Sequence, residues 1–146
     1  MRVEEIMSSP IVTLRASATV SEAAKLMAKH NIGSLVIVPD GISSMKADEL
    51  AIVTERDILR KVVAMDKSPA IPLSEVMSKP LVTVCYDCSA REAADLMNKH
   101  NIRRLLVAKD GVVVGIVSLR DINRRLRFGL ARELLESKRD HYFRHG

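Results

Sequence analysis

Hydrophobic and polar residues alternate with a helical spacing near the start of the chain. Between residues 19 and 31 the apolar positions fall on one face of a helix: Val20, Ala23, Ala24, Met27 and Ala28. Thr19 and Glu22, three positions apart, form a capping box that predicts the helix start. Asn31 suits the end of this helix because asparagine tolerates the left-handed backbone conformation.

Short runs of apolar and β-branched residues around this helix predict strands. These runs cover 11–14, 34–38 and 50–54, and a second helix opens at 55–60. The first half of the chain therefore predicts the element order β-α-β-β-α.

The second half repeats this order. Residues 7–13 (MSSPIVT) return 70 positions later as 77–83 (MSKPLVT), and residues 22–32 return as 92–102. The matching elements are strands at 81–84, 105–108 and 112–118, a helix from about Ser89 and a helix after Arg120. A tandem duplication of this size indicates two units that bury a shared core.

One region differs in length between the repeats. Ile52 matches Ile116 at a shift of 64, so the first repeat holds six extra residues within 42–49, which we expect to form an exposed loop.

The expected fold class is α+β, with two tandem β-α-β-β-α repeats related by a pseudo-twofold axis and sheets packed against each other. We expect repeat one at 1–66, repeat two at 67–127 with a linker at 67–72, and a basic C-terminal helix or tail at 128–146.

Composition narrows the class of protein. The chain is 47% hydrophobic and 28% charged, which is typical of a soluble globular protein. It has neither a signal peptide at its start nor an apolar run near the ~20 residues that span a bilayer, so a cytoplasmic location is expected. The net charge is +5, and residues 120–146 carry eight bases against four acids, so the basic character belongs to the tail.

A hydroxyl residue and an aspartate recur together where a strand meets a helix. Thr54 precedes Asp57 by three positions, and Ser118 precedes Asp121 by three. This spacing places a hydroxyl and a carboxylate side by side at a helix start. Helix capping explains each pair in part, since threonine and serine are good N-caps and an acid suits the first turn.

The chain resembles a stand-alone pair of cystathionine-β-synthase (CBS) domains, a unit known as a Bateman module. The residues that carry the resemblance come in matched pairs over about 1–127: Met7–Pro10 with Met77–Pro80, His30–Ile32 with His100–Ile102, and Thr54–Asp57 with Ser118–Asp121. Gly115 fits the family pattern, whereas repeat one has Ala51 at that position.

This resemblance implies a regulatory module that binds AMP, ADP or ATP, with S-adenosylmethionine or NAD-like ligands as the alternative. It also implies two pockets, each shared between the repeats. The residues implied for the first pocket are Ile52, Thr54, Asp57, Ser78, Pro80, Ile102 and Arg103. Those implied for the second are Ile116, Ser118, Asp121, Ser8, Pro10, Ile32 and Gly33.

The side-chain chemistry agrees with these roles. An ionised aspartate only accepts hydrogen bonds, and the two hydroxyls of a ribose offer two donors together. Thr54 and Ser118 can bond the sugar or the α-phosphate, while Ile32 and Ile102 offer apolar walls for adenine.

Cations for phosphate are distributed unevenly between the repeats. Arg103-Arg104 stands where repeat one has Gly33-Ser34, and Arg56 and Arg120 occupy the two helix starts. Arginine suits phosphate because its planar fork donates two hydrogen bonds at once. We therefore predict unequal pockets, with the one that includes Arg103 better suited to a di- or triphosphate. The alternative is that Arg103 and Arg104 only flank a strand on a solvated edge.

Cys85 and Cys88 form a lone C-x-x-C. A structural zinc site needs more ligands, and a thioredoxin-like centre needs the pair to open a helix, whereas Cys88 precedes the expected cap Ser89. The matching residues 15–18 contain no cysteine, so the fold does not require the pair. A redox enzyme built on these cysteines is one of three hypotheses for the function of the chain.

No cluster in the sequence argues for catalysis or a metal. His30 and His100 follow a helix without a second ligand at metal spacing, so they are interpreted as helix-end charges. We therefore expect no enzyme activity, no catalytic residue, no metal and no cofactor apart from a regulatory nucleotide.

The leading hypothesis is an energy sensor that binds adenine nucleotide, forms a homodimer and acts on a partner protein. The alternative is a nucleic-acid-associated regulator, because the tail from Ile122 has leucines four apart with arginines between them. No nucleic-acid-binding motif accompanies that tail, and no membrane partner is expected.

Overall fold

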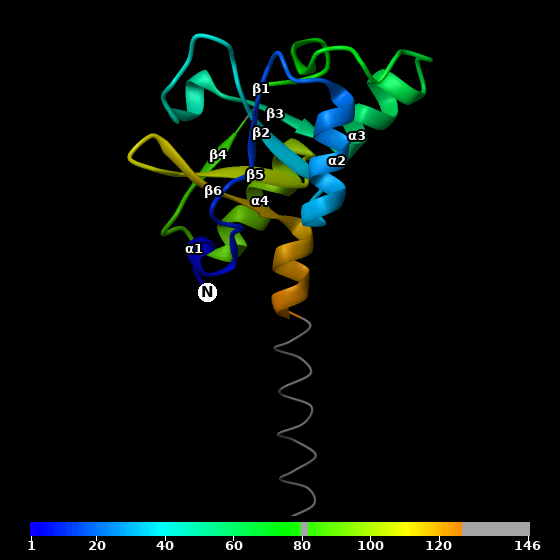
Figure 1. Ribbon diagram of the computed structural model, residues 1–146. Helices are drawn as coiled ribbons and strands as arrows, with labels where there is room; N and C mark the ends of the chain where they lie inside the picture. The colour runs from blue at the N-terminus through cyan, green and yellow to red at the C-terminus, as the bar shows by residue number, and fades with distance from the viewer. Residues whose placement is uncertain (80–81, 127–146) are drawn as a thin grey trace, which may run out of the picture.

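The computed structural model describes residues 1–79 and 82–126 (Figure 1). The predictions made for Pro80, for the start of the strand at 81–84 and for the basic tail at 128–146 lie outside the described residues.

The first repeat has the predicted order of elements. It contains β1 (Thr13–Arg15), α2 (Val20–His30), β2 (Ser34–Val38), β3 (Ala51–Thr54) and α3 (Glu55–Ile58). Strand β2 is central, with β1 parallel on one side and β3 antiparallel on the other. A π-helical stretch, η2 (Leu59–Val63), continues α3, and a short 3-10 turn, η1 (Ala47–Glu49), precedes β3.

The second repeat has the same topology. Its elements are β4 (Thr83–Cys85), α4 (Ala90–His100), β5 (Arg104–Lys109) and β6 (Val112–Ser118), followed by a helix that is described over 119–126. Strand β5 is central between parallel β4 and antiparallel β6. The α+β class and the β-α-β-β-α order are therefore confirmed, while the first strand of repeat one starts later than predicted, at Thr13.

The long helices begin and end where the sequence predicted. The Thr19 hydroxyl accepts the Glu22 N–H at 3.1 Å, and the Glu22 carboxylate accepts the Thr19 N–H at 3.0 Å. Ser89 caps α4 in the same way. Asn31 and Asn101 follow the two helices in the left-handed conformation, with φ of 52° and 51°. These contacts satisfy backbone groups that a helix end leaves without partners.

The core of each repeat is completed by the segment that precedes the other repeat in the sequence. The short helix α1 (Val3–Ile6) packs on repeat two, where Val3 and Ile6 join its core beside α4 (Figure 1). The 3-10 turn η3 (Leu73–Glu75) packs on repeat one through Leu73 and Val76. Residues 1–10 and 71–79 are called the exchanged segments below.

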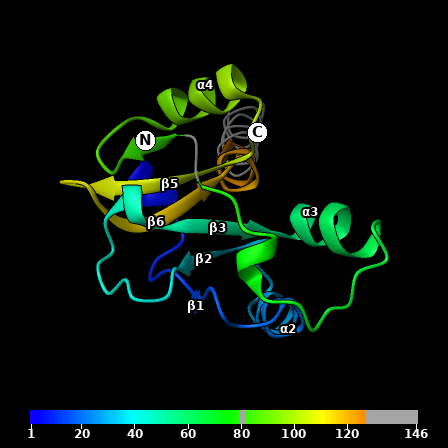
Figure 2. The same ribbon diagram turned by 90° about the horizontal axis from the view of Figure 1, so that it is seen from above.

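The two sheets face each other between α2 and α4, as the view from above shows (Figure 2). The core between them consists of buried aliphatic residues from both repeats, namely Val36, Val38, Leu50, Leu106 and Val113. Each repeat also has its own core between sheet and helix. The predicted packing of sheet on sheet is therefore confirmed, and neither half buries its sheet faces alone.

The insertion in repeat one is not simply the exposed loop that the sequence predicted. The Val113 N–H donates to the Met45 carbonyl at 2.8 Å, and the Ala47 N–H donates to the Gly111 carbonyl at 3.0 Å. Met45 and Ala47 also pack against the core between the sheets. The insertion therefore joins the β5–β6 hairpin of the other repeat, because its apolar side chains lose water contact there.

Among the described residues, no helix combines the length and the apolar character needed to cross a bilayer.

Candidate functional site

A large cavity lies between the repeats, with a volume of about 1070 Å³. All seven residues that the sequence assigned to the second pocket line it: Ser8, Pro10, Ile32, Gly33, Ile116, Ser118 and Asp121. They come from an exchanged segment, the turn after α2, the end of β6 and the following helix start. The cavity is called the Asp121 cavity below.

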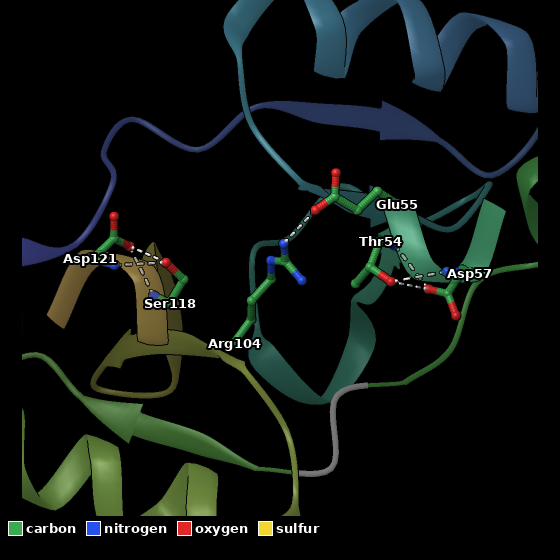
Figure 3. Close-up of polar contacts among 6 residues, drawn as sticks. All are labelled: Thr54, Glu55, Asp57, Arg104, Ser118 and Asp121. Carbon is green, nitrogen blue, oxygen red and sulfur yellow. Dashed lines mark hydrogen bonds and ion pairs between the residues drawn. The ribbon is translucent and has the colours of Figure 1, made fainter. Parts of the chain in front are cut away.

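Both predicted hydroxyl–aspartate pairs form capping boxes. The Asp121 Oδ2 accepts the Ser118 N–H at 2.9 Å and the Ser118 hydroxyl at 2.8 Å. The Asp57 Oδ2 accepts the Thr54 N–H at 2.9 Å and the Thr54 hydroxyl at 3.1 Å. Capping thus uses one oxygen of each carboxylate and leaves the other for a second partner (Figure 3).

The second oxygen of Asp57 already has a partner. Lys61 Nζ lies 3.2 Å from Asp57 Oδ1, and the same ammonium donates to the Val76 carbonyl at 2.9 Å. The Asp57 side chain is only 16% exposed. A sugar hydroxyl that approached Asp57 would have to displace a lysine held at two points.

The second oxygen of Asp121 has no hydrogen-bond or ion-pair partner among residues 1–79 and 82–126. The residue lines the large cavity and is half-buried. A carboxylate oxygen in this position can accept from a ligand hydroxyl without breaking a protein contact. The two repeats are thus chemically unequal at their equivalent aspartates.

Positive charge dominates the wall of the Asp121 cavity. Five arginines line it: Arg56, Arg103, Arg104, Arg120 and Arg124. The acids on the same wall are Glu55 and Asp121, so the lining carries three more positive than negative charges. Positive charge concentrated in a cleft attracts anions, and arginine guanidinium groups can make bidentate contacts with phosphate.

Arg104 crosses the cavity to the other repeat. Its Nη2 atom lies 3.3 Å from Glu55 Oε1, and this ion pair lies between the two capping boxes (Figure 3). A Cβ atom at Gly33 would meet the Arg104 guanidinium and would lie 2.9 Å from Glu55 Oε1. Glycine at position 33 therefore leaves room for the pair.

Arg103 lines a different pocket from the one to which the sequence assigned it, and Arg104 lines the same cavity. The sequence grouped Arg103 with Asp57, whereas the structure places both arginines on the cavity that contains Asp121. Arg56, from repeat one, and Arg120, from repeat two, line the same cavity.

Five described residues of the first predicted pocket do not line this cavity, namely Ile52, Thr54, Asp57, Ser78 and Ile102. Ile52 and Ser78 form a backbone bridge, with the Ile52 N–H 2.8 Å from the Ser78 carbonyl oxygen. Ile102 packs on the core of repeat two, while Thr54 and Asp57 form their own capping box. Pro80 is outside the described residues.

Glu55, Arg124 and His30 line the cavity but were not assigned to it from the sequence. Glu55 and Arg124 were detectable in principle, because each lies within three residues of an assigned aspartate on the same helix. Their pairing across the repeats could not be read from spacing. A shallower hollow of about 320 Å³ adjoins the cavity, where Ala24, Met27 and Ile58 add an apolar wall.

Cys85 and Cys88 are joined by a disulfide at the end of β4, with Cα atoms 5.2 Å apart. Asp87 lies close enough to place a carboxylate oxygen within 4.8 Å of both sulfur atoms. In this state both sulfurs belong to the disulfide, so they are not available as metal ligands.

Comparison with known proteins identifies the family. The CBS domain model matches residues 3–64 and 73–127, and the chain therefore belongs to the CBS domain family as a tandem pair. A CBS domain-containing protein of Bacillus subtilis, YhcV, is 35% identical over 120 residues, which cover 82% of this chain and 81% of that protein.

Solved structures of relatives share the fold. The CBS domain protein PAE2072 from Pyrobaculum aerophilum, complexed with AMP, is 34% identical with a TM-score of 0.72, covering 83% of this chain and 89% of that one. The CBS domain pair of protein MJ0100, in complex with 5′-methylthioadenosine and S-adenosyl-L-methionine, is 32% identical with a TM-score of 0.73, covering 88% and 98%. The hexameric CBS-CP12 protein from bloom-forming cyanobacteria is 36% identical with a TM-score of 0.74, covering 84% and 69%.

Proposed function

We propose that this chain is a regulatory module that binds one adenine nucleotide in the Asp121 cavity and reports its level to a partner protein. The observation that carries the proposal is the coincidence, in one cavity, of an available carboxylate oxygen and five arginines. Relatives solved with AMP and with S-adenosyl-L-methionine support an adenosine ligand.

The ribose is assigned to Asp121. Its second oxygen accepts from the ribose hydroxyls, while its first oxygen keeps the Ser118 capping contacts. A hydrogen bond to a charged group contributes about 1.5–3 kcal/mol, which corresponds to roughly 10- to 100-fold in affinity. Ile32 and Pro10 provide apolar surface for the base.

The phosphates are assigned to the arginines. Arg104 and Arg120 enter the cavity from repeat two and Arg56 enters from repeat one, so a polyphosphate would contact both repeats at once. A ligand that spans the repeats favours one relative arrangement by its difference in affinity for the two. That difference is the physical basis of signalling to a partner.

Isothermal titration calorimetry tests this function. We expect binding of one ATP per chain, with affinity falling in the order ATP, ADP, AMP because each phosphate lost removes contacts with arginine. S-adenosylmethionine carries a positive sulfonium centre, so the arginine-lined cavity should bind it more weakly than ATP. A protein that binds S-adenosylmethionine or NAD in preference to all three nucleotides would support the alternative ligand class.

The module is proposed to work as a homodimer. Leu59, Val63 and Met65 expose 59%, 62% and 62% of their surface at the end of α3 and η2. Apolar side chains grouped in this way commonly mark protein contacts. Light scattering should give the mass of a dimer. A larger oligomer would contradict the homodimer and would instead resemble the hexameric relative.

Nucleic-acid binding through the basic tail stays the second candidate. Binding of DNA or RNA that falls steeply with salt and disappears on truncation after Arg127 would favour it. We also predict that the isolated chain has no catalytic activity.

A further inference from the structure

The disulfide between Cys85 and Cys88 lies in the turn that joins β4 to α4. Cys85 is exposed and Cys88 is half-buried. Their Cα separation of 5.2 Å is within the usual range for a disulfide. Neither cysteine takes part in the proposed nucleotide site.

This turn holds the first exchanged segment in place. The Val3 N–H donates to the Cys88 carbonyl at 2.8 Å, and the Glu4 N–H donates to the Tyr86 carbonyl at 2.9 Å. In the opposite direction, the Ala90 N–H donates to the Met1 carbonyl at 2.9 Å. The start of the chain therefore rests on backbone groups of the residues that the disulfide encloses.

The same segment continues to the Asp121 cavity. The Ser8 N–H donates to the Ile116 carbonyl at 2.8 Å, and Ser8 and Pro10 line the cavity. Only a few residues separate the disulfide-bound turn from the cavity wall. A change in how the segment docks on the turn is thus transmitted along a short, backbone-bonded path.

Repeat one makes the equivalent contacts without cysteine. The Leu73 N–H donates to the Ala18 carbonyl at 2.8 Å, and the Ser74 N–H donates to the Ala16 carbonyl at 3.0 Å. These residues match Val3, Glu4, Cys88 and Tyr86 at the repeat distance of 70. The turn and its docked segment therefore form without a cross-link, and the disulfide adds something that the fold itself does not require.

We propose that Cys85 and Cys88 form a thiol–disulfide exchange site whose oxidation state sets how firmly residues 1–10 dock, and thereby how tightly the Asp121 cavity holds its ligand. The second part rests on the proposed nucleotide function. The first part concerns docking alone and stands on the backbone contacts.

The exchange chemistry needs a thiol or a small disulfide as co-reactant. A thiolate attacks the exposed Cys85 sulfur, the bond to Cys88 breaks, and Cys88 leaves as a thiolate that takes up a proton. A second thiolate then attacks the external sulfur of the mixed disulfide and releases Cys85. Two thiols are thus oxidised to one disulfide while the protein disulfide is reduced to two thiols, and the reverse reaction consumes a small disulfide.

Oxidation favours docking because it restricts the conformations that the turn can adopt. A turn already fixed in the docked geometry loses less conformational freedom when the segment binds it. The cavity wall is then preorganised, so the oxidised protein should bind nucleotide more tightly. Coupling between two sites is typically ~5- to 150-fold, and we expect a factor near the lower limit, roughly 5-fold, because the segment keeps its other contacts.

Amide hydrogen exchange tests the docking directly. After treatment with dithiothreitol, the amides of Val3, Glu4 and Ser8 should exchange roughly 5-fold faster than in protein oxidised with glutathione disulfide. Leu73 and Ser74 make the matching contacts in repeat one, so their amides serve as an internal control and should not respond. Equal protection of Val3 and Glu4 in the two states would overturn the proposal.

Calorimetry with ATP then tests the coupling. Oxidised wild-type protein should bind roughly 5-fold more tightly than reduced protein. The double variant Cys85→Ser, Cys88→Ser should match the reduced protein and ignore dithiothreitol. Equal affinities in the two redox states would overturn the coupling. Absence of ATP binding in both states would instead contradict the nucleotide function, while the amide measurement would still decide whether docking is redox-dependent.

Discussion

Equivalent residues in the two repeats have been given different partners. Asp57 and Asp121 both cap a helix, but Lys61 pairs with the outer oxygen of Asp57, whereas that of Asp121 has no partner among the described residues. The sequence predicted both aspartates at helix starts because the capping spacing is local. The sequence did not show that the two aspartates would differ, because a basic residue follows each of them by four positions. Lys61 pairs with Asp57, whereas Arg125, at the matching place in repeat two, donates to the Glu5 carbonyl.

Glu55 offers a test at the scale of one residue. Its Oε1 atom lies 3.3 Å from Arg104 Nη2, so its carboxylate competes with the ligand's phosphates for this arginine. Glu55→Gln should therefore tighten ATP binding by roughly 2- to 5-fold, because an exposed ion pair contributes about 0–1 kcal/mol. The change should be larger for ATP than for AMP in calorimetry.

Glu75→Gln is the matched control, since Glu75 is an exposed acid on η3 that does not line the cavity. It should leave the affinity for ATP unchanged. Equal tightening by the two variants would mean that general charge, and not release of Arg104, governs the effect.

At the scale of elements, the sequence located helices and strands well because their signals are local. The capping boxes at Thr19 and Ser89 and the asparagines after α2 and α4 placed both long helices. The first strand of repeat one was placed too early because apolar character alone does not mark where pairing starts. The insertion at 42–49 was misjudged because its partner, the β5–β6 hairpin, is distant in sequence.

Gly115 on β6 tests the docking of the first exchanged segment. A Cβ atom there would lie 3.0 Å from the Ser8 carbonyl oxygen and would also meet the Met7 side chain. Gly115→Ala should lower the free energy of unfolding by about 1–3 kcal/mol, since overpacking forces the backbone apart. Thermal or urea unfolding measures this change.

Gly33→Ala is the comparison variant for this prediction. The atoms that its Cβ would meet belong to the flexible ends of Arg104 and Glu55. These ends can move, so stability should change little. If Gly33→Ala cost as much as Gly115→Ala, the backbone contact of Ser8 would not be the reason for glycine at position 115.

At the scale of the whole molecule, the two repeats form one folding unit. Each repeat lends a segment to the other, and a core of residues from both sheets lies between them. The repeat itself predicted the pseudo-symmetric pairing. The grouping of Arg103 and Arg104 with Asp121 was not predicted, because it depends on how the halves face each other and not on spacing within either one.

Leu106 tests this shared core. It is 1% exposed between the sheets, and Leu106→Ala should lower the free energy of unfolding by about 2–5 kcal/mol. Because both repeats lose packing at once, circular dichroism should record a single transition at a lower temperature. Val112, which is 42% exposed, provides the control, and Val112→Ala should change stability far less. Two separate transitions in the Leu106 variant would contradict the single folding unit.

Titration of ATP into Asp121→Asn and Asp57→Asn decides which aspartate holds the ribose. Asparagine keeps an oxygen for the capping contacts but removes the charge and replaces the outer acceptor with an N–H donor. If Asp121 holds the ribose, Asp121→Asn should weaken ATP binding by roughly 10- to 100-fold, while Asp57→Asn should leave it nearly unchanged. Equal losses in the two variants, or a loss confined to Asp57→Asn, would contradict this assignment.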